Sequence, residues 1–220
     1  MKLLERIQVI SYLRNIIYLI VLTITFSAHS GAYEDFLSAI RRDDASSVQS
    51  LLLRGLDPNT PNEAGISAVH WALQEESFKA AAALIQAPGL AFDKENEHGE
   101  TPLMMAALKG QKALVQLLLD RGARAHKAGW APLHYAASGP DAEVVAVLLS
   151  SNASTQARSP NATTPLMMAA GYGLEASVDL LLAAKADPTA KNDLGLTAAD
   201  FAQRAGRDAL AKRLAQAASR

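Results

Sequence analysis

The stretch Thr-Pro-Leu-Met-Met-Ala-Ala occurs at residues 101–107 and again at residues 164–170, and the variant Ala-Pro-Leu-His-Tyr-Ala-Ala occupies residues 131–137. Looser copies begin at Ser67 and Thr197, so the five copies lie 30 to 34 residues apart. A repeat period near 33 residues indicates stacked units, each of which buries its apolar side only against its neighbours. Such stacking favours an extended binding surface over an enclosed catalytic pocket.

Each unit carries residues that suit a pair of helices. Thr at the start of the motif can cap a free backbone N–H, and Pro at the first helical position has no N–H to leave unpaired. The paired alanines that follow leave little side chain between helix backbones. A leucine-rich segment comes after most motifs, for example at residues 117–119 and 180–182, and should fill the space between successive helix pairs.

These features resemble the ankyrin-repeat family, whose unit reads roughly Thr-Pro-Leu-His-x-Ala-Ala, a glycine turn, a leucine-rich second helix and Gly-Ala-Asp. The resemblance covers about residues 34–218. It implies that residues 31–220 form an all-α solenoid of about six helix-turn-helix units, joined by β-hairpins or loops, with the two end units as caps. The expected units lie near residues 34–62, 63–96, 97–126, 127–159, 160–192 and 193–220.

Some positions depart from the family pattern. Residues 122–132 are three residues shorter than their counterparts, so one connecting finger should be short. The motif histidine should be structural at His70 and His134, but two units carry Met104 and Met167, where its hydrogen bonds should be absent. Three turn positions that usually need a positive φ lack glycine, and only Asn and Asp tolerate that geometry easily: Asp43, Asn152 and Lys185.

Residues 1–30 form a separate segment. Three basic residues precede an apolar run at residues 16–26, and small residues follow it, which is typical of a secretory signal peptide cleaved after Ser30 or Ala32. The alternative is an uncleaved anchor, because residues 15–33 contain no Asp, Glu, Lys or Arg and about 20 residues can span a bilayer. In both cases we expect the basic residues to stay on the cytoplasmic side of the membrane and the repeats to be exported across it.

The composition narrows the compartment and the partner. The chain of 220 residues has no cysteine, so its stability must come from stacking, and thiolate catalysis and thiolate metal sites are excluded. Because ankyrin proteins are usually intracellular, an exported member without cysteine points to a bacterial periplasm, with secretion or anchoring as alternatives. Removing residues 1–30 leaves a net charge of about −3, which disfavours nucleic acid as a partner. Membrane contact is expected only if the N-terminal segment stays uncleaved.

The sequence carries no catalytic signature. It lacks a nucleophile elbow, a phosphate-binding loop and a His-Glu-x-x-His pair, so we expect no catalytic residue, cofactor or metal ion. A surface metal site would have to use His98 and His126 with nearby carboxylates. The expected function is a non-catalytic protein–protein interaction module that binds or supports another exported protein. The alternatives are a dedicated inhibitor or immunity protein of a secreted enzyme and, more distantly, a metal-dependent or hydrolytic enzyme.

In the ankyrin family, partners usually meet the hairpin tips and the concave ends of the first helices. Trp130 and Tyr172 have no core role in the motif, and exposed aromatic residues often anchor partners. Trp130 could instead pack over the short finger. An aromatic and methionine row should mainly pack between units: Trp71, Met105, Tyr135, Met168 and Phe201. The predicted binding surface comprises Glu97, His98, Glu100, Lys127, Trp130, Asn161, Tyr172, Asp193 and Leu194.

Overall fold

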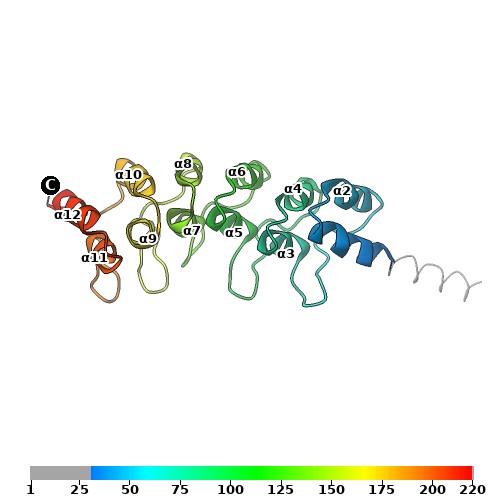
Figure 1. Ribbon diagram of the computed structural model, residues 1–220, viewed down its shortest axis with the longest axis horizontal. Helices are drawn as coiled ribbons and strands as arrows, with labels where there is room; N and C mark the ends of the chain where they lie inside the picture. The colour runs from blue at the N-terminus through cyan, green and yellow to red at the C-terminus, as the bar shows by residue number, and fades with distance from the viewer. Residues whose placement is uncertain (1–30, 220) are drawn as a thin grey trace, which may run out of the picture.

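The computed structural model describes residues 31–219, which form six helix pairs in a row (Figure 1). The first pair is a helix over residues 31–41 with α2 (Ala45–Leu53). The others are α3 (Ala68–Gln74) with α4 (Phe78–Gln86), α5 (Pro102–Leu108) with α6 (Lys112–Asp120), α7 (Pro132–Ser138) with α8 (Ala142–Ser150), α9 (Pro165–Tyr172) with α10 (Glu175–Ala183), and α11 (Ala198–Arg204) with α12 (Asp208–Ala218). The predicted all-α solenoid is therefore confirmed.

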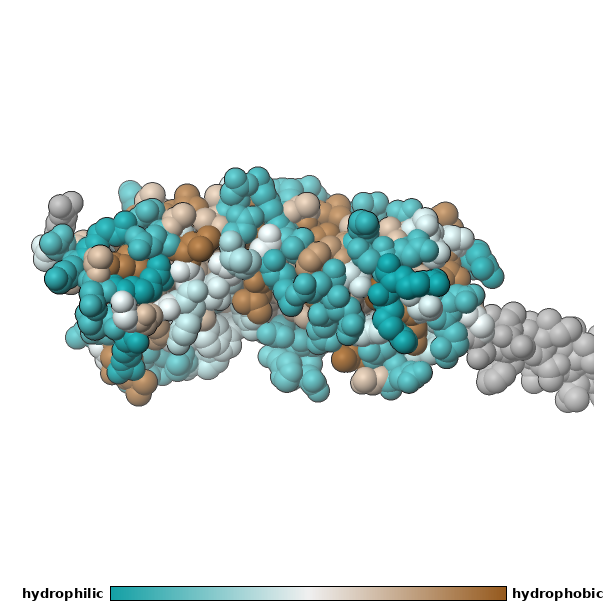
Figure 2. All heavy atoms as spheres, in the orientation of Figure 1, coloured by the Kyte–Doolittle hydropathy of each residue, from teal (hydrophilic) through white to brown (hydrophobic). Residues whose placement is uncertain are grey.

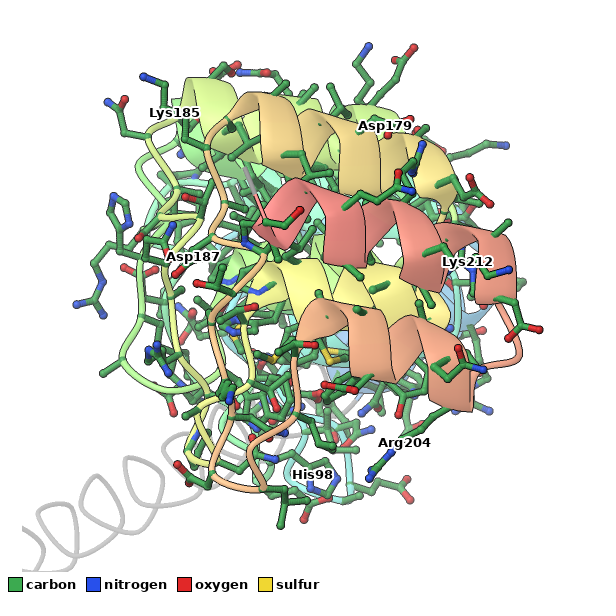
Figure 3. The ribbon with its side chains drawn as sticks, turned by 90° about the vertical axis from the view of Figure 1, so that its left-hand side faces the viewer. His98, Asp179, Lys185, Asp187, Arg204 and Lys212 are labelled. Carbon is green, nitrogen blue, oxygen red and sulfur yellow. The ribbon has the colours of Figure 1, made fainter. Side chains whose placement is uncertain are left out.

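The helices lie in two layers. The first helices of successive units pack side by side from α3 to α11, and the second helices do the same from α2 to α10. The loops between pairs, here called fingers, all extend from the same side of the first-helix layer (Figures 1 and 3). Apart from one antiparallel bridge between Pro61 and Ser67, residues 31–219 contain no paired strand. Fingers and first helices together form the inner face.

Leucines of the second helices fill the space between units. Leu118, Leu148 and Leu181 lie at equivalent places in α6, α8 and α10, and all three side chains are fully buried. The paired alanines of the first helices are also buried, which lets neighbouring backbones approach closely. Since no single helix pair could bury these side chains, the stability of each unit depends on its neighbours.

The departures from the repeat have visible consequences. The finger before α7 extends less far than its neighbours (Figure 1). The other internal fingers share a pair of backbone hydrogen bonds, such as Asn96 N–H to the Glu100 carbonyl and Gly99 N–H to the Asn96 carbonyl. In the described residues the loop before α7 has no counterpart of this pair. The predicted positive φ angles are confirmed at 53°, 61° and 63° for Asp43, Asn152 and Lys185.

The motif histidines connect consecutive units. His134 accepts a hydrogen bond from the Ala131 N–H at Nδ1 and donates from Nε2 to the Thr163 carbonyl of the next finger. His70 does the same between the Ser67 hydroxyl and the Glu100 carbonyl. Because Nδ1 accepts a hydrogen bond in both cases, these bonds require the neutral imidazole. Both rings are also buried, and burial lowers the pKa of both histidines.

The expectation that these hydrogen bonds are absent in the methionine units is half wrong. Met104 Sδ accepts from the Thr101 N–H at 3.3 Å, and Met167 Sδ accepts from the Thr164 N–H at 3.4 Å. The thioether sulfur therefore takes over the acceptor role within the unit. It has no hydrogen to donate, so only the bond to the next finger is missing.

We expect the stability of the protein to fall as the pH falls from 7 towards 5. The pKa of a buried histidine is lower in the folded state than its ordinary value near 6.5, so below that pH the histidine takes up a proton on unfolding. Each such group lowers the free energy of unfolding by up to about 1.4 kcal/mol per pH unit. His134→Met, which copies Met104 and Met167, should flatten this dependence. Urea midpoints at pH 7.5 and 5 measure the effect, and an equally steep decline in the variant would contradict it.

The predicted signal peptide or anchor lies outside the described residues. Among residues 31–219, no helix combines the length and the apolar character that a membrane span requires.

Candidate functional site

The inner face is lined by three positions of the repeated motif. The first is the residue before the motif: Ile66, Glu100, Trp130, Thr163 and Leu196. The second is the fifth residue: Trp71, Met105, Tyr135, Met168 and Phe201. The third is the eighth residue, at the end of the first helix: Gln74, Leu108, Ser138, Gly171 and Arg204. Most of these residues border hollows of the inner face, which places the repeat's variable chemistry there.

Two adjoining hollows of about 650 and 230 Å³ lie along α5, α7, α9 and α11. They share Leu108, Trp130, Ser138 and Met168, so we treat them as one depression. The further lining includes Asn161, Tyr172, Leu194, Phe201 and Arg204, and the whole is here called the central groove. The fifth-position row thus changes role along the chain: Trp71 and Met105 are buried, whereas Met168 and Phe201 are partly exposed and line the groove.

Exposed apolar side chains concentrate in this groove. Among the described residues five large apolar side chains are exposed, and three of them line the groove: Leu108 at 41%, Tyr172 at 69% and Leu194 at 74%. On the face shown in Figure 2, hydrophilic residues dominate and hydrophobic atoms form separate groups. A gathering of exposed apolar side chains in one depression is a mark of an interaction surface.

Trp130 combines features of the two roles predicted for it, a contact with a partner and packing within the protein. Its ring packs edge-on against His134 at 5.3 Å and Tyr135 at 6.4 Å between centroids, so it covers α7. It is only half-buried and also lines both hollows of the central groove. Its geometry therefore suits a packing role and a contact role together.

The groove has an uneven charge distribution. Burial and the neighbouring Glu100 carboxylate raise the pKa of Tyr135 to about 12, so its hydroxyl stays protonated. His134 is neutral, for the reasons given above. Arg204 is the one formally charged side chain in the lining of the groove, and it extends from the end of α11 (Figure 3).

The remaining predicted contact residues lie elsewhere. Asn96 accepts hydrogen bonds from the backbone N–H groups of His98 and Glu100 and so shapes the finger before α5, with His98 at its tip (Figure 3). Lys127 contacts this finger through the Gly99 carbonyl and an ion pair of 3.2 Å with Glu95. The structure thus places Glu97, His98, Glu100 and Lys127 in one group, and Trp130, Asn161, Tyr172 and Leu194 in the groove. Asp193 adjoins the groove through its N–H bond to the Asn161 carbonyl.

A further hollow of about 540 Å³ lies at the short finger. Its polar lining includes Asp93, Arg124 and His126. Arg124 pairs with Asp93 at 2.9 Å, so these charges satisfy each other. Across residues 31–219, no three His, Cys, Asp or Glu side chains gather closely enough to hold a metal ion.

Several groove residues were missed by the sequence analysis, among them Leu108 and Ser138. Both occupy the eighth position of the motif, which carries a different residue in every unit. The signal was available: a position that differs while its neighbours repeat is free of the packing demands that fix the repeat. Such a position faces solvent or a partner.

A family model described as "Ankyrin repeats (3 copies)" matches residues 36–128, 88–159 and 123–192. The chain belongs to the ankyrin-repeat family. The matched segments are repeats that generally act as non-catalytic modules for protein–protein interaction, and they indicate no catalytic domain.

Three of the relatives that share the ankyrin repeats are animal proteins much longer than this chain. The tyrosine-protein kinase Shark of Drosophila melanogaster is 31% identical over 164 residues, which cover 72% of this chain and 18% of Shark. Protein glp-1 of Caenorhabditis elegans is 29% identical over 185 residues, covering 77% and 14% respectively. Neurogenic locus notch homolog protein 4 of Homo sapiens is 41% identical over 93 residues, covering 40% and 5%. The chain spans less than a fifth of each relative, so the similarity concerns the repeat segment.

Proposed function

We propose that this ankyrin-repeat protein binds another exported protein through the central groove and does not itself catalyse a reaction. The observation that carries the proposal is the gathering of Leu108, Tyr172 and Leu194 as exposed apolar side chains in one depression. Interfaces draw most of their binding energy from a few such anchors, with aromatic residues prominent among them. The rigid helix stack holds these anchors in place before the partner arrives, which lowers the entropic cost of binding.

The exported, periplasmic location is part of the proposal. Its support is the order of basic, apolar and small residues over residues 1–32. The absence of cysteine is compatible with an oxidising compartment, because no thiol is at risk of wrong pairing.

Export can be measured with a phosphatase reporter that is active only outside the cytoplasm, fused to the C-terminus of the full chain. We expect an active reporter, because the apolar run directs the repeats across the membrane. Leu19→Arg with Leu22→Arg should silence it, since two charges interrupt the apolar run of residues 16–26. An inactive wild-type fusion, present at normal amounts, would place the repeats in the cytoplasm.

The groove is tested by capturing proteins from the envelope fraction with the tagged full chain and measuring the affinity of the captured protein. Tyr172→Ala should weaken binding by more than about 1 kcal/mol, as expected of an aromatic anchor. Its unfolding midpoint should stay unchanged, because the side chain is largely exposed.

Leu53→Ala is the matched control. Leu53 is also a large exposed side chain, but it lies in α2, away from the groove, so its loss should leave binding intact. If the wild-type chain and Tyr172→Ala bind the partner with equal affinity, the partner binds outside the central groove. The same conclusion follows if only Leu53→Ala weakens binding. If the captured protein is an enzyme, a fall in its activity on adding the chain would identify the inhibitor alternative.

A further inference from the structure

The central groove has an apolar half. Its smaller hollow, of about 230 Å³, is walled by Leu108, Trp130, Tyr135 and Met168, with a polar edge at Ser138. Met168 is flexible and polarisable and adapts to the shape of a neighbouring side chain. The Trp130 ring supplies a flat apolar wall whose orientation is fixed by its edge-on packing against Tyr135. Such a hollow suits one large apolar side chain.

The other half of the groove carries a positive charge that forms no ion-pair contact among the described residues. Arg204 is exposed, and no carboxylate of the described residues lies within ion-pair distance of its guanidinium. Asp200 lies one turn earlier on α11, and its Oδ2 accepts from both the backbone N–H and the hydroxyl of Thr197 at 2.7 Å, so it caps the helix. These hydrogen bonds are the main cause of the lowered pKa of Asp200, and the charge of Arg204 is a smaller one. By contrast, Arg213 is paired with Glu175 and Asp179. The guanidinium of Arg204, which makes no ion-pair contact of its own, is thus available to a partner's carboxylate.

We infer that the central groove selects a peptide segment that presents one large apolar side chain to the Trp130–Met168 hollow and one carboxylate to Arg204. This inference rests on the proposed function and specifies the partner chemistry. Packed helices lie about 8–10 Å apart, so the hollow between α7 and α9 lies roughly 10–15 Å from the end of α11. An extended chain covers that distance in about three or four residues at about 3.3 Å each.

The probe is a fluorescein-labelled peptide of ten residues, made of Gly and Ser except for one Phe and one Glu four positions later. Fluorescence anisotropy with the full chain measures its dissociation constant. We expect replacement of the peptide's Glu by Gln to weaken binding about fivefold or more, and Arg204→Gln in the protein to do the same. The two changes together should weaken binding no further than either alone, because both remove one interaction.

A charge exchange and a matched control make the test specific. Arg204→Glu should bind the peptide with Lys in place of Glu better than the original peptide. Lys212→Gln removes the same charge from α12, outside the lining of the groove, and should change the dissociation constant less than twofold. A third peptide lacks the Glu and carries its carboxylate only as the free C-terminus, with the C-terminally amidated peptide as its control. Tighter binding of this peptide than of the Phe–Glu peptide would identify a C-terminal carboxylate as the partner group, and weaker binding would identify an acidic side chain.

The inference is overturned if no Phe–Glu peptide binds at millimolar concentration, or if Arg204→Gln and Lys212→Gln change binding equally. Circular dichroism of each variant checks that the exposed substitutions leave the fold intact. The proposed function can fail separately. A chain that captures an envelope protein regardless of Arg204→Gln retains the proposed function without this selectivity, whereas a wild-type chain that captures no protein lacks the function itself.

Discussion

Leu118→Ala should lower the free energy of unfolding by about 2–5 kcal/mol, the range for removing a fully buried leucine and leaving a cavity. Leu118 lies in α6 with no exposed surface, and α6 packs between α4 and α8. The cavity would therefore weaken the central units on both sides. Because stability in a repeat stack is a sum of units and their interfaces, the whole array should unfold at a lower urea concentration.

Urea unfolding followed by circular dichroism measures this effect. Leu53→Ala is again the matched control, because the same atoms are removed from a side chain that is 89% exposed, and the expected change is within about 0.5 kcal/mol. A loss below about 0.5 kcal/mol for Leu118→Ala would mean that the second helices do not stack as the structure places them.

Fold and stacking were predictable from the sequence because the same chemistry repeats. The motif starting at Thr101 fixes a helix start by its cap and its proline, and its recurrence at Thr164 gives the period directly. The short finger before α7 was also predictable, because a deletion in a regular repeat can be counted.

Interactions between units were much harder to predict. Arg207 donates from Nη1 to the carbonyl oxygens of Ala169, Ala170 and Gly173 at 2.9 to 3.1 Å, and so ties the last unit to the end of α9. The sequence shows only one of several basic residues in a terminal cap. The partners are backbone atoms 34 to 38 residues away, and backbone carbonyls carry no sequence signal.

The candidate site was predicted in part. The family pattern pointed to Trp130, Asn161, Tyr172 and Leu194, which the structure brings to one groove. It pointed equally to His98, at the tip of a different finger. A repeat places equivalent positions on one face, but it does not say which unit carries the hollow. That depends on the size of each side chain and on how closely neighbouring helices approach.

Close approach is most evident where α9 ends. Gly173 has φ −96°, which any residue can adopt, so its backbone conformation does not require glycine. A Cβ there would overlap the carbonyl oxygen of Ala137 in the preceding unit and would also press on Ala169 Cα. Both obstacles are backbone atoms, which cannot rotate away as a side chain can.

Gly173→Ala should therefore destabilise the protein by about 2 kcal/mol or more, at the upper end of the range for overpacking a close contact. Gly171→Ala is the matched control, two residues earlier in α9. The nearest atoms to its Cβ would belong to the Phe201 side chain, the closest a ring carbon at 3.3 Å, and this ring can shift. Alanine also suits a helix better than glycine by up to about 1 kcal/mol. Urea midpoints should separate the two variants clearly. Equal midpoints would show that α7 and α9 can move apart at little cost in free energy. The close contact between Gly173 and the Ala137 carbonyl would then not set the width of the central groove.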